Sequence, residues 1–154
     1  FVGQLKKSMS WKMNEIRHLS HCTYLVQYHL VWCSKFRYDV LENDVEASLK
    51  EILREVCERY KYEILELETM PDHVHIFVSV KPTVAPTDVV RALKSISAIK
   101  LFERFPALRK FYSRCGSLWS KGYFVGTVGY VGAETIRKYI REQKSKDKRG
   151  EDGC

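Results

Sequence analysis

The sequence has no long apolar run, no Cys-x-x-Cys pair and no Gly/Ser-rich stretch that would mark a linker between domains. A membrane-spanning helix needs about 18–20 consecutive apolar residues, and no run reaches that length. The first residues also lack the basic region, apolar run and small-residue cleavage site of a secretory signal. We therefore expect a cytoplasmic protein.

The cysteines exclude two further classes of protein. There are five, an odd number, and they are scattered along the chain. This spacing argues against a disulfide scaffold and against a structural zinc site. Cys33 and Cys57 lie in apolar stretches, so we expect buried free thiols in a reducing compartment.

The chain is long and apolar enough for one domain with its own core, at 154 residues and 45% hydrophobic. We expect an N-terminal extension of unassigned role over 1–20, the domain over 21–146 and a charged tail over 147–154. The net charge is +7 and the pI about 9.2. A basic surface attracts polyanions, of which nucleic acid is the commonest.

Residue patterns predict four strands and three helices. β-branched and aromatic residues, or alternation with period two, predict strands; apolar residues at helical spacing predict helices. The predicted strands are Cys22–Trp32, Tyr62–Glu68, His73–Val80 and Trp119–Val128. Asn43 or Asp44 is the predicted cap of the first helix, and Thr87 or Asp88 is that of the second. The last predicted helix starts at Ala133. This βαββαβ order is the α+β, ferredoxin-like pattern: an antiparallel sheet with helices on one face, here followed by an extra C-terminal helix.

Two histidines carry the clearest chemical signal. His73 and His75 are separated by one residue on a predicted strand, so their side chains share a face. Their backbones are then about 6.6 Å apart, which suits two ligands of one metal ion. The intervening Val74 and the following Ile76 would face the core. A solvated sheet face is the alternative, and a metal site would still need a third ligand.

The last helix offers that ligand and a nucleophile. Tyr139 and Gln143 are four residues apart, so they share one helix face. The amide oxygen of Gln143 is a hard ligand suited to Mg²⁺ or Mn²⁺. Tyr139 could attack a phosphate bound to that metal ion, provided that the phenolate form of its side chain is stabilised over the neutral phenol. Alternatively, Tyr139 packs in the core. Glu142 is a rival ligand, but it lies nearly a right angle away from this face.

Basic and aromatic residues predict contacts with DNA. Trp32 and Phe36 could stack on unpaired bases. Asp72 either orients the imidazole of His73 or simply forms a turn. His29 is expected in the core or against substrate. The basic candidates for phosphate contacts are Lys35, Arg37, Lys94, Arg137, Lys138 and Arg141.

These motifs together resemble a known family. His73-Val74-His75 is similar to the HUH motif (His, hydrophobic, His) of single-stranded DNA endonucleases. Its combination with Tyr139 and Gln143 on a terminal helix resembles the single-tyrosine transposases of "two-hundred"-type insertion sequences (TnpA). Further segments that are similar to this family are Tyr28–Trp32, Lys35–Tyr38, Met70–Asp72, Leu118–Ser120 and Gly122–Val125.

The resemblance implies a specific chemistry. His73, His75 and Gln143 would bind a divalent metal, Mg²⁺ or Mn²⁺, and Tyr139 would form a 5′-phosphotyrosine link. The substrate would be single-stranded DNA with a hairpin near each element end. The enzyme would be a homodimer with active sites shared between subunits.

Two alternatives remain at this point. One is a ferredoxin-like module that binds nucleic acid without cutting it; it predicts aromatic residues where this sequence has histidines. The other is a relaxase or replication initiator of the same superfamily. Relaxases and replication initiators are typically longer chains. They often have two tyrosines, or have the tyrosine before the histidines in the sequence.

Overall fold

The computed structural model describes residues 16–127, 137–138 and 141–142. Its first two strands form a hairpin, and the later strands form a four-stranded sheet. The elements in chain order are β1 (Arg17–Leu19), β2 (Cys22–Tyr24), β3 (Gln27–Cys33), the 3₁₀ turn η1 (Lys35–Arg37), α2 (Asn43–Tyr60), β4 (Glu63–Thr69), β5 (His73–Ser79), α3 (Pro86–Arg104), α4 (Pro106–Phe111) and β6 (Phe124–Thr127).

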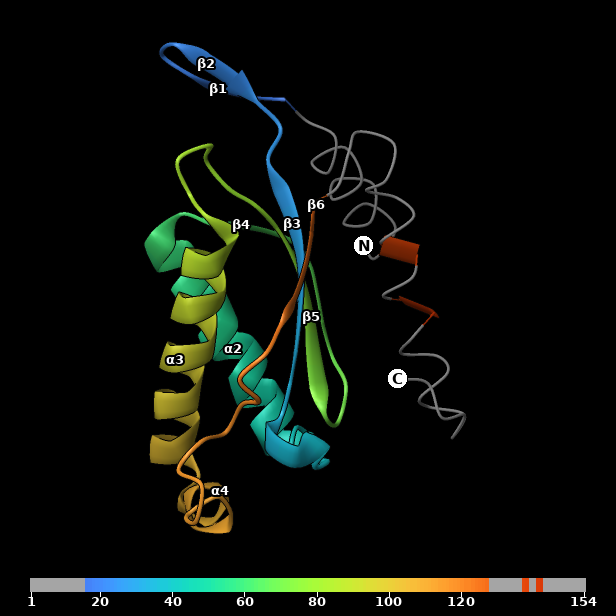
Figure 1. Ribbon diagram of the computed structural model, residues 1–154, viewed down its shortest axis with the longest axis vertical. Coiled ribbons are helices and arrows are strands. Elements are labelled where there is room, and N and C mark those ends of the chain that lie inside the picture. The colour runs from blue at the N-terminus through green and yellow to red at the C-terminus, as the bar shows by residue number, and fades with distance from the viewer. Residues whose placement is uncertain (1–15, 128–136, 139–140, 143–154) are drawn as a thin grey trace.

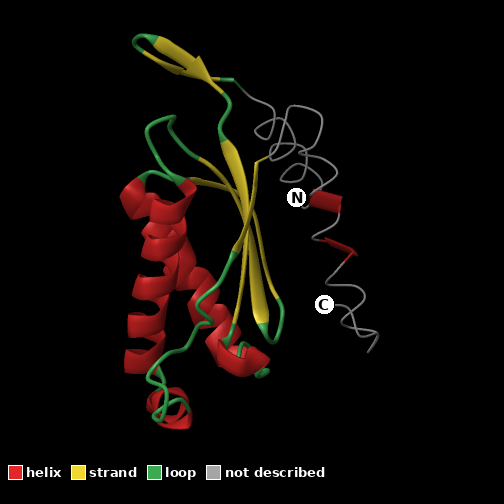
Figure 2. Ribbon diagram, viewed as in Figure 1, coloured by secondary structure: helices red, strands yellow, loops and turns green. Residues whose placement is uncertain are grey.

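The four-stranded sheet has the order β4-β5-β3-β6, and every neighbouring pair is antiparallel. Helices α2 and α3 pack side by side on one face of it (Figures 1 and 2). The predicted α+β class, with an antiparallel sheet and helices on one face, is confirmed. None of the helices in the described ranges has both the length and the apolar character that membrane crossing requires.

Side-chain alternation along the central strands separates two sheet faces. On the helix side, the core contains Leu30 and Trp32 of β3 together with Val74, Ile76 and Val78 of β5. Each of these side chains is at most 1% exposed. Because alternate residues point to opposite faces, the residues between them face away from the helices. That second face, which we call the histidine face, carries His29 of β3 and His73 and His75 of β5.

The structure corrects three local predictions. The predicted strand 22–32 is two strands, β2 and β3, and β2 pairs with β1 in a hairpin that spans the expected boundary between the extension and the domain. Neither long helix has the predicted cap: the residue before α2 is Glu42 and the one before α3 is Ala85, each without a side-chain capping bond. Pro86 instead occupies the start of α3, where its missing N–H is not needed.

Lys94, predicted as a DNA contact, connects α3 to the segment before β6. Its Nζ donates to the backbone oxygens of Ser120 at 2.6 Å, Gly122 at 3.1 Å and Lys121 at 3.4 Å. Burial lowers the pKa of this ammonium. Three carbonyls therefore match its three N–H donors, and a contact with a phosphate would have to displace one of them.

We expect Lys94→Met to destabilise the fold, because it removes a charged donor from three backbone acceptors. The free energy of unfolding should fall by about 2 kcal/mol, measured by urea denaturation. Lys121→Met is the matched control, since Lys121 is exposed, and it should change stability by less than about 0.5 kcal/mol. Unchanged stability in Lys94→Met, with weakened DNA binding, would instead make Lys94 a phosphate contact.

Candidate metal site

The pairing of β3 with β5 brings three histidines together on the histidine face. His73 and His75 lie on β5, opposite Cys33 and Val31 of β3. Their ring centroids are 4.9 Å apart, with the ring planes at 70°. Both side chains are nearly fully buried, at 1% and 3% exposed. The predicted shared face is therefore present, and the two rings do not lie on a solvated surface.

His73 is held by its neighbour Asp72. The Nδ1 atom of His73 lies 2.5 Å from Asp72 Oδ1. Asp72 is also bound by Arg37, whose Nη2 is 3.1 Å from Asp72 Oδ2. Burial alone would raise the pKa of Asp72, but the hydrogen bond and charge of His73, with those of Arg37, give a net lowering. An ionised Asp72 accepts the proton of His73 Nδ1 and leaves the lone pair on Nε2.

His75 is held by a residue that the sequence did not mark for this role. His29 Nε2 lies 3.3 Å from His75 Nδ1, and the two rings stack with centroids 5.5 Å apart and planes at 14°. Burial, then the charges of His73 and His29, lower the pKa of His75 to about 3. Burial lowers the pKa of His29 as well. Both rings are therefore neutral at physiological pH, the form in which imidazole binds metals.

The histidine pair fits a divalent metal. His73 Nε2 is buried and has no hydrogen-bond partner within the part of the chain that the structure describes. An unpartnered buried nitrogen is unfavourable unless a ligand engages it. No group of three or more His, Cys, Asp and Glu side chains in the described ranges is arranged so that it could hold a metal ion, so a third protein ligand is of another type or lies elsewhere. The predicted Tyr139 and Gln143 lie outside the described residues.

A buried ion pair connects the C-terminal segment to the histidine face. Residues 137–138 and 141–142 are helical, and 137–138 lie on the side of the sheet away from α2 and α3 (Figure 1). Arg137 Nε is 3.2 Å from Glu66 Oε2 of β4, with the side chains only 5% and 12% exposed. Burial raises the pKa of Glu66, while the charges of Arg137 and Arg141 oppose the rise.

The remaining predicted DNA contacts differ in exposure. Arg137 is 4% exposed and serves the ion pair with Glu66. Lys138 and Arg141 are exposed, with the Lys138 ammonium 3.9 Å from Glu142. Lys35 is partly buried, and its ammonium lies 5.3 Å from the ring centroid of Phe36.

Comparisons with known proteins agree on one family. The family described as "Transposase IS200 like" matches residues 22–143. The chain is 40% identical over 125 residues to the ISDra2 transposase TnpA of Deinococcus radiodurans, covering 80% of this chain and 88% of the relative. It is 34% identical over 139 residues to the transposase for insertion sequence element IS200 of Salmonella typhimurium, covering 90% of each.

Solved structures show the same fold. A candidate transposase from Deinococcus radiodurans superposes with a TM-score of 0.69 at 36% identity, covering 82% of this chain and 97% of that one. A REP-associated tyrosine transposase bound to a REP hairpin superposes with a TM-score of 0.51 at 12% identity, covering 80% of this chain and 67% of that one. Fold and sequence thus define a transposase of the HUH type. The chain belongs to the IS200-like transposase family.

We expect Asp72→Asn to weaken metal binding, because the change removes the anion that holds the His73 imidazole. The affinity for Mn²⁺ should fall by about 10- to 100-fold, measured by titration calorimetry. Asp39→Asn is the control, since Asp39 is exposed. Full affinity in Asp72→Asn, together with lost affinity in His73→Ala, would show that Asp72 does not position the ligand.

We expect Glu66→Leu to loosen the C-terminal segment, because it leaves Arg137 buried opposite an apolar side chain. Breaking such a pair costs about 3–5 kcal/mol, and replacing both partners is far milder. Amide hydrogen exchange at residues 137–142 should therefore accelerate in Glu66→Leu and slow again in Glu66→Leu/Arg137→Met.

The control for this experiment is the exposed pair of Lys138 and Glu142, at 76% and 56% exposure. Glu142→Gln should leave the exchange rates nearly unchanged, since exposed pairs contribute about 0–1 kcal/mol. Equal exchange in Glu66→Leu and the unmodified protein would show that the buried pair does not fasten this segment.

Proposed function

We propose that this transposase cleaves and rejoins single-stranded DNA at insertion-sequence ends, with Tyr139 as nucleophile. The observation that carries the proposal is the pair of side-by-side imidazoles, His73 and His75. Each Nδ1 atom is occupied by a fixed neighbour, Asp72 or His29. This leaves Nε2 as the atom on each ring that is suited to a common ligand.

The DNA phosphate is the reacting group in this proposal. The Tyr139 phenol oxygen attacks phosphorus, and the bond from phosphorus to the 3′ oxygen breaks. The phenolic proton is lost to water or a nearby base, and the leaving 3′ oxygen takes up a proton. The products are a 5′-phosphotyrosine and a free 3′-hydroxyl. Because one phosphodiester replaces another, a 3′-hydroxyl can reverse the step without ATP.

His73, His75 and Gln143 would hold a divalent cation, Mg²⁺ or Mn²⁺, which would supply Lewis acidity at the phosphate. The residues of this chain have separate tasks around it. Asp72 and His29 orient the imidazoles of His73 and His75. The Glu66–Arg137 pair holds the segment that precedes Tyr139.

Hairpin recognition and a shared dimeric site complete the proposal. A structural neighbour carries a REP hairpin, and a basic chain of net charge +7 suits a DNA hairpin. The resemblance to single-tyrosine transposases supports a homodimer in which Tyr139 acts on the histidine pair of the partner subunit. Lys138 and Arg141, both exposed, are available for phosphate contacts.

We expect the protein to form a covalent adduct with single-stranded DNA carrying a hairpin and its flanks, in Mg²⁺ or Mn²⁺. The adduct is detected as a slower band in a denaturing gel. Tyr139→Phe should abolish it, because phenylalanine lacks the attacking oxygen. His73→Ala should slow its formation roughly 100-fold or more, as loss of stabilisation at the phosphate does.

Tyr123→Phe is the matched control, because Tyr123 is a 40% exposed tyrosine directly before β6. It should form the adduct at the normal rate. An adduct that persists in Tyr139→Phe and disappears in Tyr123→Phe would overturn the assignment of the nucleophile. Oligonucleotides taken from the DNA flanking this gene supply the hairpin and cleavage sequences.

A further inference from the structure

A row of exposed aromatic rings lies beside the candidate metal site. It consists of Phe36 of η1, Tyr38 after η1 and Phe111 of α4, and we call it the aromatic row. The three side chains are 62%, 49% and 57% exposed. The ring centroids of Phe36 and Tyr38 are 5.8 Å apart, and those of Tyr38 and Phe111 are 5.3 Å apart. Residues distant in sequence thus form one continuous aromatic surface.

The backbone that presents this row is strained. Phe36 and Arg37 have φ values of 60° and 54°, in the left-handed region that non-glycine residues rarely adopt. Each such residue costs about 1–3 kcal/mol. The strained turn leaves Phe36 in solvent at 62% exposure, so burial of this ring does not offset the strain. Backbone strain of this kind clusters at functional sites.

The aromatic row packs against a buried tyrosine. Tyr112, which is 2% exposed, contacts Phe111 edge-on at 5.0 Å and donates its hydroxyl to the backbone oxygen of Lys35 at 3.1 Å. Burial raises the pKa of Tyr112 to about 12, so this hydroxyl remains a donor. The exposed rings therefore lie on a fixed base.

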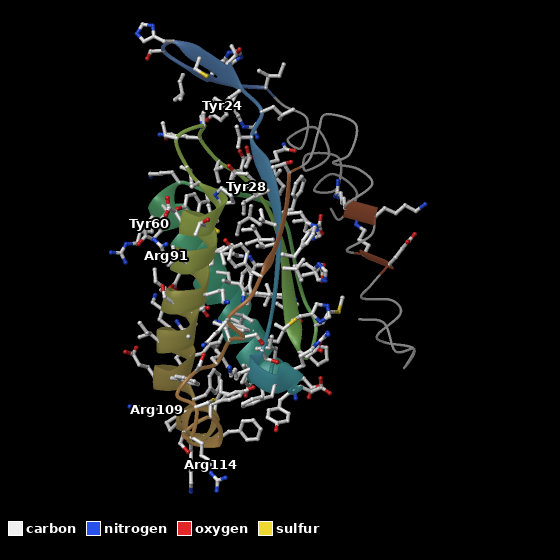
Figure 3. All side chains as sticks on the ribbon, viewed as in Figure 1. Tyr24, Tyr28, Tyr60, Arg91, Arg109 and Arg114 are labelled. Carbon is white, nitrogen blue, oxygen red and sulfur yellow. The ribbon has the colours of Figure 1, made fainter. Side chains whose placement is uncertain are left out.

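One cation contacts the aromatic row, and further cations lie at the same end of the molecule. The Lys35 ammonium is 5.3 Å from the Phe36 ring centroid. Arg109 and Arg114 extend from the α4 end of the molecule (Figure 3), and both are exposed. Aromatic rings flanked by cations suit a ligand with flat π-faces on an anionic backbone. A purely apolar partner would not need these cations.

The row connects to the histidine pair through two residues. Arg37 follows Phe36 in the chain and binds Asp72 at 3.1 Å, and Asp72 binds His73 at 2.5 Å. Two side chains, Arg37 and Asp72, thus link the turn that carries Phe36 to His73. Trp32, the other aromatic residue predicted to stack on bases, is 1% exposed and lies in the core, so it cannot do so.

We propose that the aromatic row is a binding site for the unpaired bases of single-stranded DNA next to the histidine pair. This proposal rests on the proposed function only for the step after binding, in which a phosphate is delivered to His73 and His75. Bases stack on Phe36, Tyr38 and Phe111, while Lys35 and the arginines of the α4 end contact phosphates. Stacking accepts any base, so the row sets the path of the strand rather than its sequence.

The test separates stacking from charge. Two fluorescein-labelled probes are used, an oligothymidine and an abasic strand with the same number of phosphates. The variant Phe36→Leu/Phe111→Leu keeps apolar bulk and removes two π-faces. Its affinity for oligothymidine, measured by fluorescence anisotropy, should fall about fivefold or more, because each stacked base contributes substantially to binding. Its affinity for the abasic strand should stay within about twofold.

Two matched variants complete the design. Tyr60→Leu removes an aromatic ring that is 44% exposed at the other end of the helix layer (Figure 3), and it should bind both probes normally. Phe36→Tyr/Phe111→Tyr retains the π-faces and should restore binding of oligothymidine. Circular dichroism melting of each variant verifies that the fold is intact.

Other outcomes overturn the proposal. Equal loss for both probes would show a general electrostatic effect, and no loss for either would show that bases do not contact the row. A change from dimer to monomer in sedimentation, with normal oligothymidine binding, would make the row a subunit interface. Adduct formation is scored separately: stacking without adducts would leave the row in place and refute the cleavage chemistry.

Discussion

The pairing of β3 with β5 is the constraint on which the rest of the molecule depends. This register sets Leu30 and Trp32 against the helices together with Val74 and Ile76. It equally sets His29, His73 and His75 on the other face. A slip of one residue would turn the histidines of β5 into the core and its valines outward. The hydrophobic packing that stabilises the sheet therefore also fixes the geometry of the site.

Burial then determines the chemistry of those histidines. A buried imidazolium is unfavourable, and burial is the largest cause of the lowered pKa values of His75 and His29. His73 is oriented by an anion, because Asp72 lies at its Nδ1 atom. One ring is thus oriented by a carboxylate and the other by a neutral ring. The two imidazoles are arranged before any ligand arrives, which lowers the entropic cost of binding one.

The sequence predicted what depends on local periodicity and missed what depends on strand pairing. Alternation was enough to assign His73 and His75 to one face and Val74 and Ile76 to the other. It could not show that His29 stacks on His75, because that contact requires the register between β3 and β5. The structural roles of Lys94 and Arg137 could not be predicted from the sequence either. Their partners, Ser120 and Glu66, are distant in sequence. Without those partners, a basic residue with a structural role cannot be distinguished from one that contacts phosphate.

The turn after β3 couples the strained backbone to the site. Asp72 has two carboxylate oxygens: Oδ1 faces His73, and Oδ2 faces Arg37. Relaxing the left-handed conformation of Arg37 would move its guanidinium away from Asp72. That carboxylate would then lose a fixed partner and hold the His73 ring less firmly. The same strain that exposes Phe36 therefore keeps Arg37 over Asp72, so the surface beside the site and the orientation of His73 are maintained by one piece of backbone.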